Sequence, residues 1–358
     1  MRNNQLAVRY AILAAVCYGV CTPLSKWFLH RVSPTLMASL LYLGAGAGMA
    51  LVAAIKTHQS HEQKEARLSK RDLPYIIGMI LLDIAAPILL MLGLSLASPA
   101  TVSLLNNFEI VATSIIAFVL FKETIGKRLW VAIGLITIAS ILLSFDGFEG
   151  VSFSTGALFA LLACICWGFE NNFTRMLSLK DPLEIVIIKG LGSGLGALAV
   201  AAATGGLQAD WRYAPVVMLL GFFAYGLSIY FYILAQRDLG AARTSAYYAG
   251  APFVGVLVSF FLFHQQLTAT FILALLLMLI GTYYTAFERH NHTHRHISMS
   301  HEHGHAHEDG HHTHIHHPPI EGYHSHFHTH EMQEHAHIHT PDLHHSHKHD
   351  DPCHEKQG

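Results

Sequence analysis

The sequence predicts an all-α polytopic membrane protein, with ten transmembrane helices arranged as two inverted five-helix repeats and followed by a disordered tail. Three observations lead to this prediction: the apolar composition, an internal repeat, and the distribution of Lys and Arg among the loops. Of the 358 residues, 52% are hydrophobic and 13% are charged. This composition is too apolar for a soluble protein, whose surface must face water.

Ten apolar stretches are each long enough to cross a hydrocarbon core of about 30 Å. We expect these spans near residues 8–28, 34–55, 73–96, 99–121, 128–146, 155–175, 183–204, 214–235, 242–263 and 269–287. The first span follows Arg2 and Arg9, but it is too long for a signal-peptide core and lacks a small-residue cleavage site, so we expect it to remain a membrane helix. The expected domains are a first repeat (8–146), a second repeat (155–287) and a tail (288–358).

The repeat is visible in two pairs of segments. Residues 18–26 read YGVCTPLSK and residues 167–175 read WGFENNFTR, so an aromatic-Gly pair followed by a basic residue recurs after 149 positions (18 to 167). The glycine-rich stretches 43–54 and 191–202 agree at an offset of 148 (43 to 191). Internal repeats in membrane chains are typical of transporters whose two related halves alternate access around a central site.

The positive charges predict the orientation. The N-terminus, the loops after spans two, four, six and eight, and the start of the tail carry 16 Lys and Arg residues, whereas the intervening loops carry three, Lys26, Arg31 and Arg212. Under the positive-inside rule, both termini face the cytoplasm, and we expect a bacterial cytoplasmic (inner) membrane. Because five spans per half is an odd number, the two repeats have opposite orientations.

Polar residues at membrane depth are the candidates for a substrate or proton path, because an ionisable side chain in lipid costs at least about 2.5 kcal/mol and normally faces a cavity. The candidates are Asp83, Asn106, Glu109, Glu170, Asn171 and Lys189. Asn106, Glu109 and Thr113 lie one turn apart, which predicts a polar stripe on one helical face. Glu109 and Glu170 could exchange a proton against a substrate. The alternative is a structural salt bridge of Lys189 with Glu170 or Asp83.

The fourth span and its counterpart in the second repeat carry a family resemblance. Residues 104–123 read LLNNFEIVATSIIAFVLFKE, and residues 247–266 read YYAGAPFVGVLVSFFLFHQQ. With the aromatic-Gly pairs at Tyr18 and Trp167, they resemble the drug/metabolite transporter superfamily, in particular its ten-helix group with two EamA domains. The resemblance implies a secondary carrier, often an exporter of amino acids, metabolites or drugs, with a central cavity lined by helices one, three, four, six, eight and nine. It does not imply a particular substrate.

The chain follows the family pattern at some positions and departs from it at others. The pair Ala251 and Pro252 matches the pattern in the second repeat. In the first repeat, Ile110 stands where the pattern has a proline, and in the second repeat His264 and Gln265 stand where it has a closing Gly-Glu.

The tail is rich in histidine. All of the 29 histidines except His30, His58, His61 and His264 lie between residues 290 and 358, with ten acidic and three basic residues. The tail has almost no apolar residues, so it cannot bury enough apolar surface to offset the entropy lost on ordering the chain. We therefore expect it to be disordered. Imidazoles at i, i+2 spacing suit Zn, Ni, Co or Cu. We expect ligands among His290, His292, His294, His296, His301, His303, His305, His307, His324, His326, His328 and His330.

The role of the tail stays open among four readings: it collects a metal that the carrier exports, it regulates export of a metal complex, it buffers metal beside an organic substrate, or it senses pH. A membrane-anchored metal sensor or store is a further alternative. We expect no enzymatic activity, because no nucleophile-base arrangement or phosphate loop is present in the connections, and no required cofactor besides the tail's metal. The expected partners are a small solute or metal ion and membrane lipid, with no nucleic acid, and a homodimer is an assembly that the sequence allows.

Overall fold

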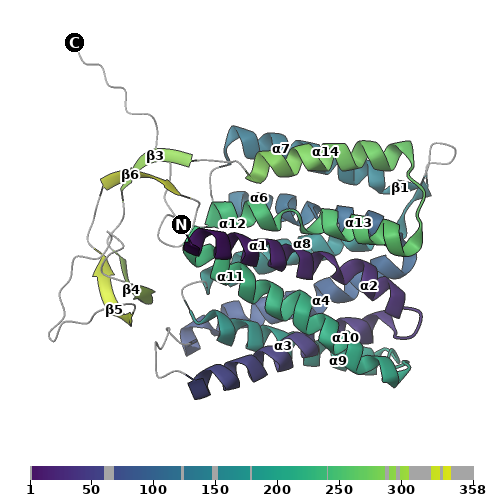
Figure 1. Cartoon of the computed structure of the whole chain (residues 1–358), viewed down its shortest axis with the longest axis horizontal. Helices are drawn as coiled ribbons and strands as arrows, with labels where there is room; N and C mark the ends of the chain where they lie inside the picture. Colours follow the sequence, from purple (N-terminus) through teal and green to yellow (C-terminus); the bar gives the residue numbers. More distant parts are fainter. Residues whose placement is uncertain are drawn as a thin grey trace, which may run out of the picture.

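A bundle of roughly parallel and antiparallel helices forms most of the molecule (Figure 1). The computed structural model describes residues 2–59, 68–121, 125–146, 152–177, 180–239, 241–286, 290–295, 299–305, 324–330 and 334–339. The prediction of an all-α polytopic membrane protein is confirmed for the bundle.

The helices of the first half follow the predicted order. They are α1 (Arg2–Gly19), α2 (Cys21–Phe28), α3 (Pro34–Gln59), the short 3₁₀ turn η1 (Lys70–Asp72), α4 (Leu73–Leu96), α5 (Pro99–Leu105), α6 (Phe108–Phe121) and α7 (Lys127–Leu143). A short antiparallel pair, β1 (Phe145–Asp146) and β2 (Ser152–Phe153), leads to the second half.

The helices of the second half correspond to the other five predicted spans. They are α8 (Thr155–Met176), α9 (Pro182–Ala203), the 3₁₀ turn η2 (Trp211–Tyr213), α10 (Ala214–Gly221), the π-helical segment η3 (Phe222–Leu227), α11 (Ser228–Leu239), α12 (Ala241–Tyr248), α13 (Ala251–Phe263) and α14 (Ala269–Ala286). η3 continues directly from α10 into α11, so these three elements correspond to one predicted span.

Seven of the ten predicted spans coincide with helical stretches of the described chain that are long and apolar enough to cross a membrane. The other three predicted spans, 128–146, 242–263 and 269–287, fall on shorter helices: α7, α13 and α14 have 17, 13 and 18 residues. At a rise of about 1.5 Å per residue, α7 and α14 still extend over about 26 Å. α12 precedes α13 and supplies the rest of the ninth span.

The contacts between helices show that the two halves are related by a pseudo-two-fold axis. α3 packs on its repeat equivalent α9, and α7 packs on its equivalent α14. The pair α4 and α8 has its counterpart in the pair α11 and α1. When the two repeats are exchanged, the pairs α3–α9 and α7–α14 are unchanged, and the pair α4–α8 becomes the pair α11–α1. This is the pattern expected for two copies of one five-helix unit.

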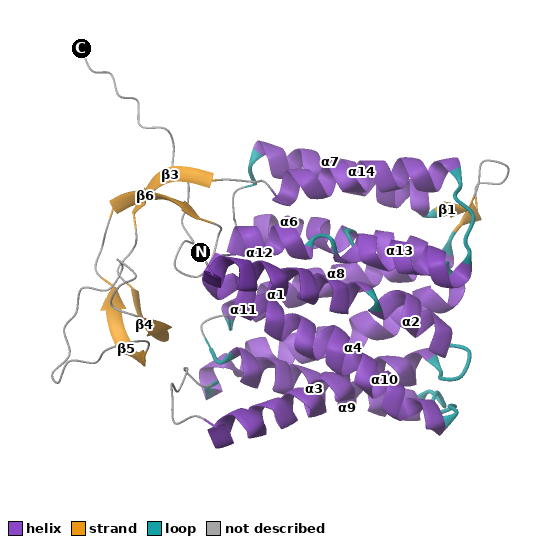
Figure 2. Cartoon of the chain, viewed as in Figure 1, coloured by secondary structure: helices purple, strands orange, loops and turns teal. Residues whose placement is uncertain are grey.

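The ends of the elements agree with an odd number of crossings in each half. In Figure 1, α1 begins at one end of the bundle, and β1, which follows the first half, lies at the opposite end. α14 returns the chain to the end at which α1 begins (Figure 2).

Glycines bring α3 and α9 into backbone contact. A Cβ atom added to Gly46 would lie 2.5 Å from the backbone nitrogen of Leu191, and one added to Gly194 would lie 2.7 Å from the backbone nitrogen of Leu43. Real Cβ atoms do not approach other atoms so closely, so these positions require glycine. Small residues promote such packing in membranes, where no hydrophobic effect drives helices together.

Prolines mark several of the helix breaks. Pro23 lies in the first turn of α2, just after the turn at Val20 that separates α1 from α2. Pro252 lies in the first turn of α13, where the missing N–H is tolerated. Pro87 lies inside α4, so the backbone carbonyl of Asp83 cannot accept a hydrogen bond from the residue four positions later.

Four strands are present in the tail. β3 (His290–Arg295) pairs with β6 (Glu334–His339), and β4 (Met299–His305) pairs with β5 (His324–His330), both antiparallel. The expectation of a disordered, metal-binding tail stays a prediction, because the other residues of the tail lie outside the described residues. Histidine recurs at every second position in these segments, which is the period of a β-strand. Pairing of the strands satisfies their backbone polar groups without a buried core. The predicted ligands His296 and His307 lie outside the described residues.

Candidate functional site

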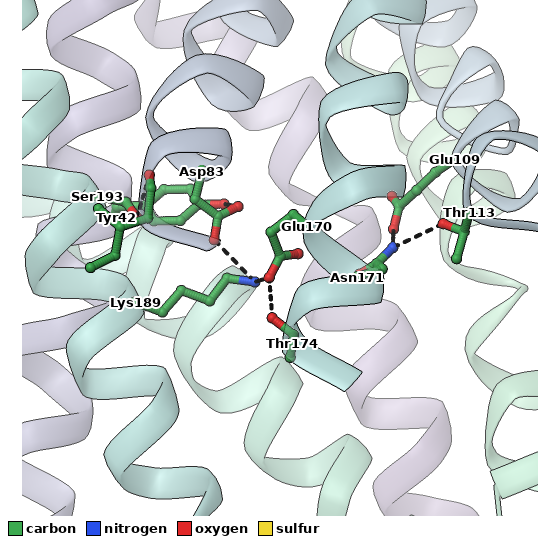
Figure 3. A network of polar contacts seen from close by, with 10 residues as sticks. Tyr42, Asp83, Glu109, Thr113, Glu170, Asn171, Thr174, Lys189 and Ser193 are labelled. Carbon is green, nitrogen blue, oxygen red and sulfur yellow. Dashed lines mark hydrogen bonds and ion pairs between the residues drawn. The ribbon is translucent and has the colours of Figure 1, made fainter. Parts of the chain in front are cut away.

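A buried group of three charges joins the two repeats. The ammonium nitrogen of Lys189 on α9 lies 2.9 Å from Oε1 of Glu170 on α8 and 3.1 Å from Oδ2 of Asp83 on α4. Figure 3 shows Lys189 reaching between the two carboxylates. The salt bridge that the sequence offered as an alternative is therefore present with both partners at once. We call these three residues the charge triad.

Hydroxyl groups complete the surroundings of the triad. Tyr42 on α3 donates a hydrogen bond of 3.0 Å to Oδ1 of Asp83, and the hydroxyl of Thr174 donates to Glu170 from the next turn of α8. Asp83 and Glu170 are 0% and 1% exposed. Four helices, two from each repeat, thus contribute to one polar centre within the bundle.

A second polar cluster surrounds Glu109 on α6. The side-chain amide of Asn171 on α8 donates to Oε1 of Glu109 at 2.7 Å and to the hydroxyl of Thr113 at 3.2 Å. Because Asn171 directly follows Glu170, α8 connects this cluster to the charge triad (Figure 3). Glu109, Thr113 and Asn171 are only half-buried, whereas Asp83 and Glu170 are fully buried.

The predicted stripe of Asn106, Glu109 and Thr113 begins at a break in the helix. The helix is interrupted at Asn106 and Asn107, between α5 and α6, and the next amides bond three residues back, as from Glu109 to the carbonyl of Asn106 at 3.1 Å. An Asn side chain competes with the backbone for hydrogen bonds and favours such breaks. Within the described chain, Oδ1 of the buried Asn106 receives no hydrogen bond.

Lys26 has a structural position at the end of the first span. Its ammonium group donates to three backbone carbonyls at the C-terminal end of α4, those of Leu94, Ser95 and Ala97, at 2.5, 3.3 and 3.0 Å. The last carbonyls of a helix have no partners within it, and a cation there is favourable for the helix dipole. Lys26 therefore holds α2 against α4.

The charges of the two clusters do not balance. Asp83, Glu109 and Glu170 carry three negative charges when ionised, and Lys189 carries one positive charge. No described residue places a cation within ion-pair distance of Glu109. Because an uncompensated charge inside a membrane bundle is costly, this centre favours the presence of a proton or another cation.

Five tyrosines form a continuous series of aromatic contacts, and sequence reasoning did not assign four of them. Their ring centroids follow one another at 5.0 Å (Tyr42 to Tyr225), 5.9 Å (Tyr225 to Tyr18), 5.7 Å (Tyr18 to Tyr248) and 5.1 Å (Tyr248 to Tyr232). The only signal in the sequence was their depth, since tyrosine in membrane helices is otherwise enriched at the two interfaces.

The comparisons with known proteins agree with this architecture. The EamA-like transporter family matches the chain twice, at residues 5–145 and 154–287. The chain belongs to the EamA-like transporter family. An uncharacterized transporter of Methanothermobacter thermautotrophicus is 22% identical over 288 residues, which cover 76% of this chain and 83% of that protein. The uncharacterized transporter YyaM of Bacillus subtilis is 22% identical over 253 residues, covering 68% of this chain and 81% of that protein.

A solved crystal structure shares the fold of this EamA-like protein. It has a TM-score of 0.55 and 15% sequence identity, and the likeness covers 78% of this chain and 94% of that one. Together with the apolar helices, these findings establish a polytopic membrane transporter of the drug/metabolite transporter superfamily.

Proposed function

We propose that this protein is a proton-coupled exporter of an organic solute, located in a bacterial cytoplasmic membrane with both termini in the cytoplasm. The observation that carries the proposal is the pair of polar clusters at the interface of the repeats, with three carboxylates and a single ammonium. The positive-inside distribution of Lys and Arg supports the orientation.

Glu109 is the group that we propose to exchange a proton against the substrate. Its carboxylate is half-buried and has an amide donor, Asn171, at 2.7 Å, but no cationic partner among the described residues. The triad carboxylates already share Lys189. Protonation of Glu109 therefore changes the local charge without first breaking an ion pair.

The position of Lys189 argues against export of a bare metal ion through this centre. A divalent cation at Asp83 and Glu170 would have to displace an ammonium group that lies within 3.1 Å of both carboxylates. Among the described residues, no group of three or more His, Cys, Asp and Glu side chains could hold a metal ion. We therefore favour an organic solute over Zn, Ni or Co as the exported species.

We propose a separate role for the tail, which is to bind divalent transition metals and regulate the carrier or buffer metal beside it. The composition supports this role, because all of the 29 histidines except His30, His58, His61 and His264 lie between residues 290 and 358. Imidazoles are suitable ligands for Zn, Ni, Co and Cu.

Inside-out vesicles test the proposal. Vesicles containing the full chain, Glu109→Gln, or a truncation after residue 286 are incubated with a low-molecular-weight cytosolic extract and with Zn, Co and Ni. Solutes are then identified by mass spectrometry, and metals are measured by elemental analysis. We expect uptake of an organic solute that requires Glu109 and a proton gradient. Metal uptake that requires Glu109 would instead establish a metal exporter, and equal uptake by Glu109→Gln would refute the coupling role.

A further inference from the structure

We propose that residues 73–82, the first half of α4, form a gate that rotates about the break at Asp83 and Pro87 and is held closed at its tip by a polar latch. We call residues 73–82 the gate segment. Because α3 returns the chain to the end of the bundle at which α1 begins, the gate segment lies at that end (Figure 1). This is the cytoplasmic end in the proposed orientation, on which the inference rests.

The backbone of α4 is interrupted where the gate segment ends. Pro87 has no N–H, so the carbonyl of Asp83 cannot accept the hydrogen bond that a regular helix would provide. Helices kink most readily at such a position. The side chain of Asp83 is held there by Lys189 at 3.1 Å and by Tyr42 at 3.0 Å. The charge triad therefore anchors the point about which the gate segment rotates.

The second repeat interrupts its equivalent span at the equivalent residue by a different means. α4 and α10 both follow a 3₁₀ turn and begin at Leu73 and Ala214, an offset of 141 (73 to 214). At this offset Pro87 corresponds to Ser228, whose N–H donates to the carbonyl of Phe223, five residues back, in the π-helical segment. Such segments occur frequently at functional sites. Both repeats thus lose a regular helical hydrogen bond at one depth, as expected for a moving joint in each half.

The two halves of α4 pack in different apolar clusters. Met79 of the gate segment lies in a small cluster with Leu177, at the end of α8, and Ile185 of α9. The buried apolar residues of α4 that belong to the main core all follow the gate segment: Ala86, Leu90, Met91 and Leu94. Movement of the gate segment therefore opens only the small cluster and leaves the main core intact.

The gate segment meets α9 through side chains that can adjust. A Cβ atom added to Gly192 would lie 2.7 Å from Cδ1 of Ile80, the end of a flexible side chain. The repeat equivalent of Gly192 is Gly44, at an offset of 148 (44 to 192). A Cβ atom added to Gly44 would collide with the backbone carbonyl of Met218 on α10. The first half of α4 is therefore less firmly packed than α10, its counterpart in the second repeat.

Two polar contacts form the latch at the tip of the gate segment. Oδ2 of Asp72, directly before α4, lies 3.5 Å from the ammonium nitrogen of Lys180. The backbone N–H of Leu68 donates to Oε2 of Glu184, in the first turn of α9, at 3.0 Å. An ion pair near the surface contributes little to stability, so the latch can open without unfolding the bundle.

The opposite end of the bundle is closed by backbone hydrogen bonds instead. The N–H of Ser33 donates to the carbonyl of Gln208 at 3.1 Å, and the N–H of Asp210 donates to the carbonyl of Arg31 at 2.9 Å. These bonds join the α2–α3 and α9–α10 connections, which are the repeat equivalents of the connections that the latch joins. Salt and side-chain replacement act on the latch but not on these backbone bonds. The gate segment is therefore the part of this conformation that opens first.

The test is alkylation of single cysteine reporters by a membrane-impermeant maleimide in inside-out vesicles. The full chain is used, with its native cysteines replaced by alanine. Met79→Cys reports on the gate segment, and Met91→Cys is the matched control, because both methionines are 0% exposed and lie on α4 on either side of the break. We expect Met79→Cys to be alkylated at least about tenfold faster than Met91→Cys, since only the small cluster opens.

Changes at the latch and at the break should act in opposite directions. Lys180→Met and Glu184→Gln should each speed alkylation of Met79→Cys by about three- to fivefold, the range of one weak polar contact. Pro87→Ala, which restores the missing N–H, should slow it by about three- to tenfold. Arg212→Met should have no effect, because Arg212 pairs with Asp210 inside one connection at the opposite end.

Salt provides a test without any further substitution. In 1 M NaCl, where the screening length is about 3 Å, alkylation of Met79→Cys should rise by about two- to threefold. If Met79→Cys does not fold, Ile185→Cys takes its place, because Ile185 lies in the same small cluster and is 7% exposed. The inference is overturned if the two reporters react equally fast, if the latch variants leave the rate unchanged, or if Pro87→Ala does not slow it.

These measurements separate the gate from the proposed function, because none of them requires a transported solute. A gate that responds as expected in a carrier that moves no organic solute would refute the exporter function alone. Transport of an organic solute that requires Glu109, with no response of Met79→Cys to the latch variants, would refute the gate alone. Faster alkylation of Met79→Cys in right-side-out vesicles would refute the proposed orientation and, with it, the cytoplasmic position of the gate.

Discussion

Replacing Lys189 by methionine removes the only positive charge of the triad while keeping a side chain of similar length. At an effective dielectric constant of about 20, two unit charges about 3 Å apart attract each other by about 5 kcal/mol, and Lys189 has two such partners, at 2.9 and 3.1 Å. Much of this attraction offsets the cost of desolvating the charges. The net loss on removing one partner of a buried pair is about 3–5 kcal/mol, because a buried charge is left uncompensated.

The assay is thermal unfolding of the detergent-solubilised full chain. We expect Lys189→Met to lower the apparent melting temperature by on the order of 10 °C. Combining it with Asp83→Asn and Glu170→Gln should restore most of this loss, because the triple variant leaves no unpaired charge. The matched control is Lys180→Met, since Lys180 pairs with Asp72 at 3.5 Å near the surface, where such a pair contributes less than about 1 kcal/mol. Equal stability of Lys189→Met and Lys180→Met, or no rescue in the triple variant, would refute the argument.

Three further predictions concern packing and capping, and all are measured as unfolding temperatures of the purified chain. Gly46→Ala should destabilise the protein by about 1–3 kcal/mol, because its Cβ would collide with the backbone of Leu191, whereas Gly134→Ala, with nothing within 4 Å of the new Cβ, should be neutral or slightly stabilising. His264→Gly should stabilise by about 1 kcal/mol, because this residue has a left-handed φ of 47°; a lower melting temperature would contradict this account. Lys26→Met should destabilise by about 1–2 kcal/mol through the lost carbonyl contacts of α4, and an unchanged value would show that water replaces them.

The membrane architecture could be predicted because it depends on local signals. Apolar stretches of sufficient length and an internal repeat identified the helices and the related halves. The left-handed backbone of His264 was not predicted, although the residue stands where the family pattern has a glycine. The break at Asn106 and Asn107 was missed because a helical period was extended through residues that favour non-helical backbone.

The site could be predicted only in part, because its geometry depends on contacts between distant segments. The candidates Asp83, Glu170 and Lys189 were identified by their depth in the predicted spans. The sequence could not show that the ammonium group of Lys189 pairs with both carboxylates, because this depends on how α9 packs near α4 and α8. The tyrosines were not identified as a cluster, since they come from helices separated by up to 230 positions (Tyr18 to Tyr248). Their apolar character makes them indistinguishable in sequence from ordinary lipid-facing or packing residues.

The pseudo-two-fold arrangement also bears on how such a chain originated. A protein of one repeat, associating as an antiparallel dimer through the surfaces that α3 and α9 share here, would carry every residue twice. At the repeat offsets of 148 and 149, the positions equivalent to Lys189 and Glu170 are occupied by Leu41 and Cys21. A symmetric dimer of identical subunits would therefore contain either two charge triads or none. Gene duplication followed by fusion allowed one half to lose or gain these charges independently, so a single triad per molecule records divergence after the two copies became one chain.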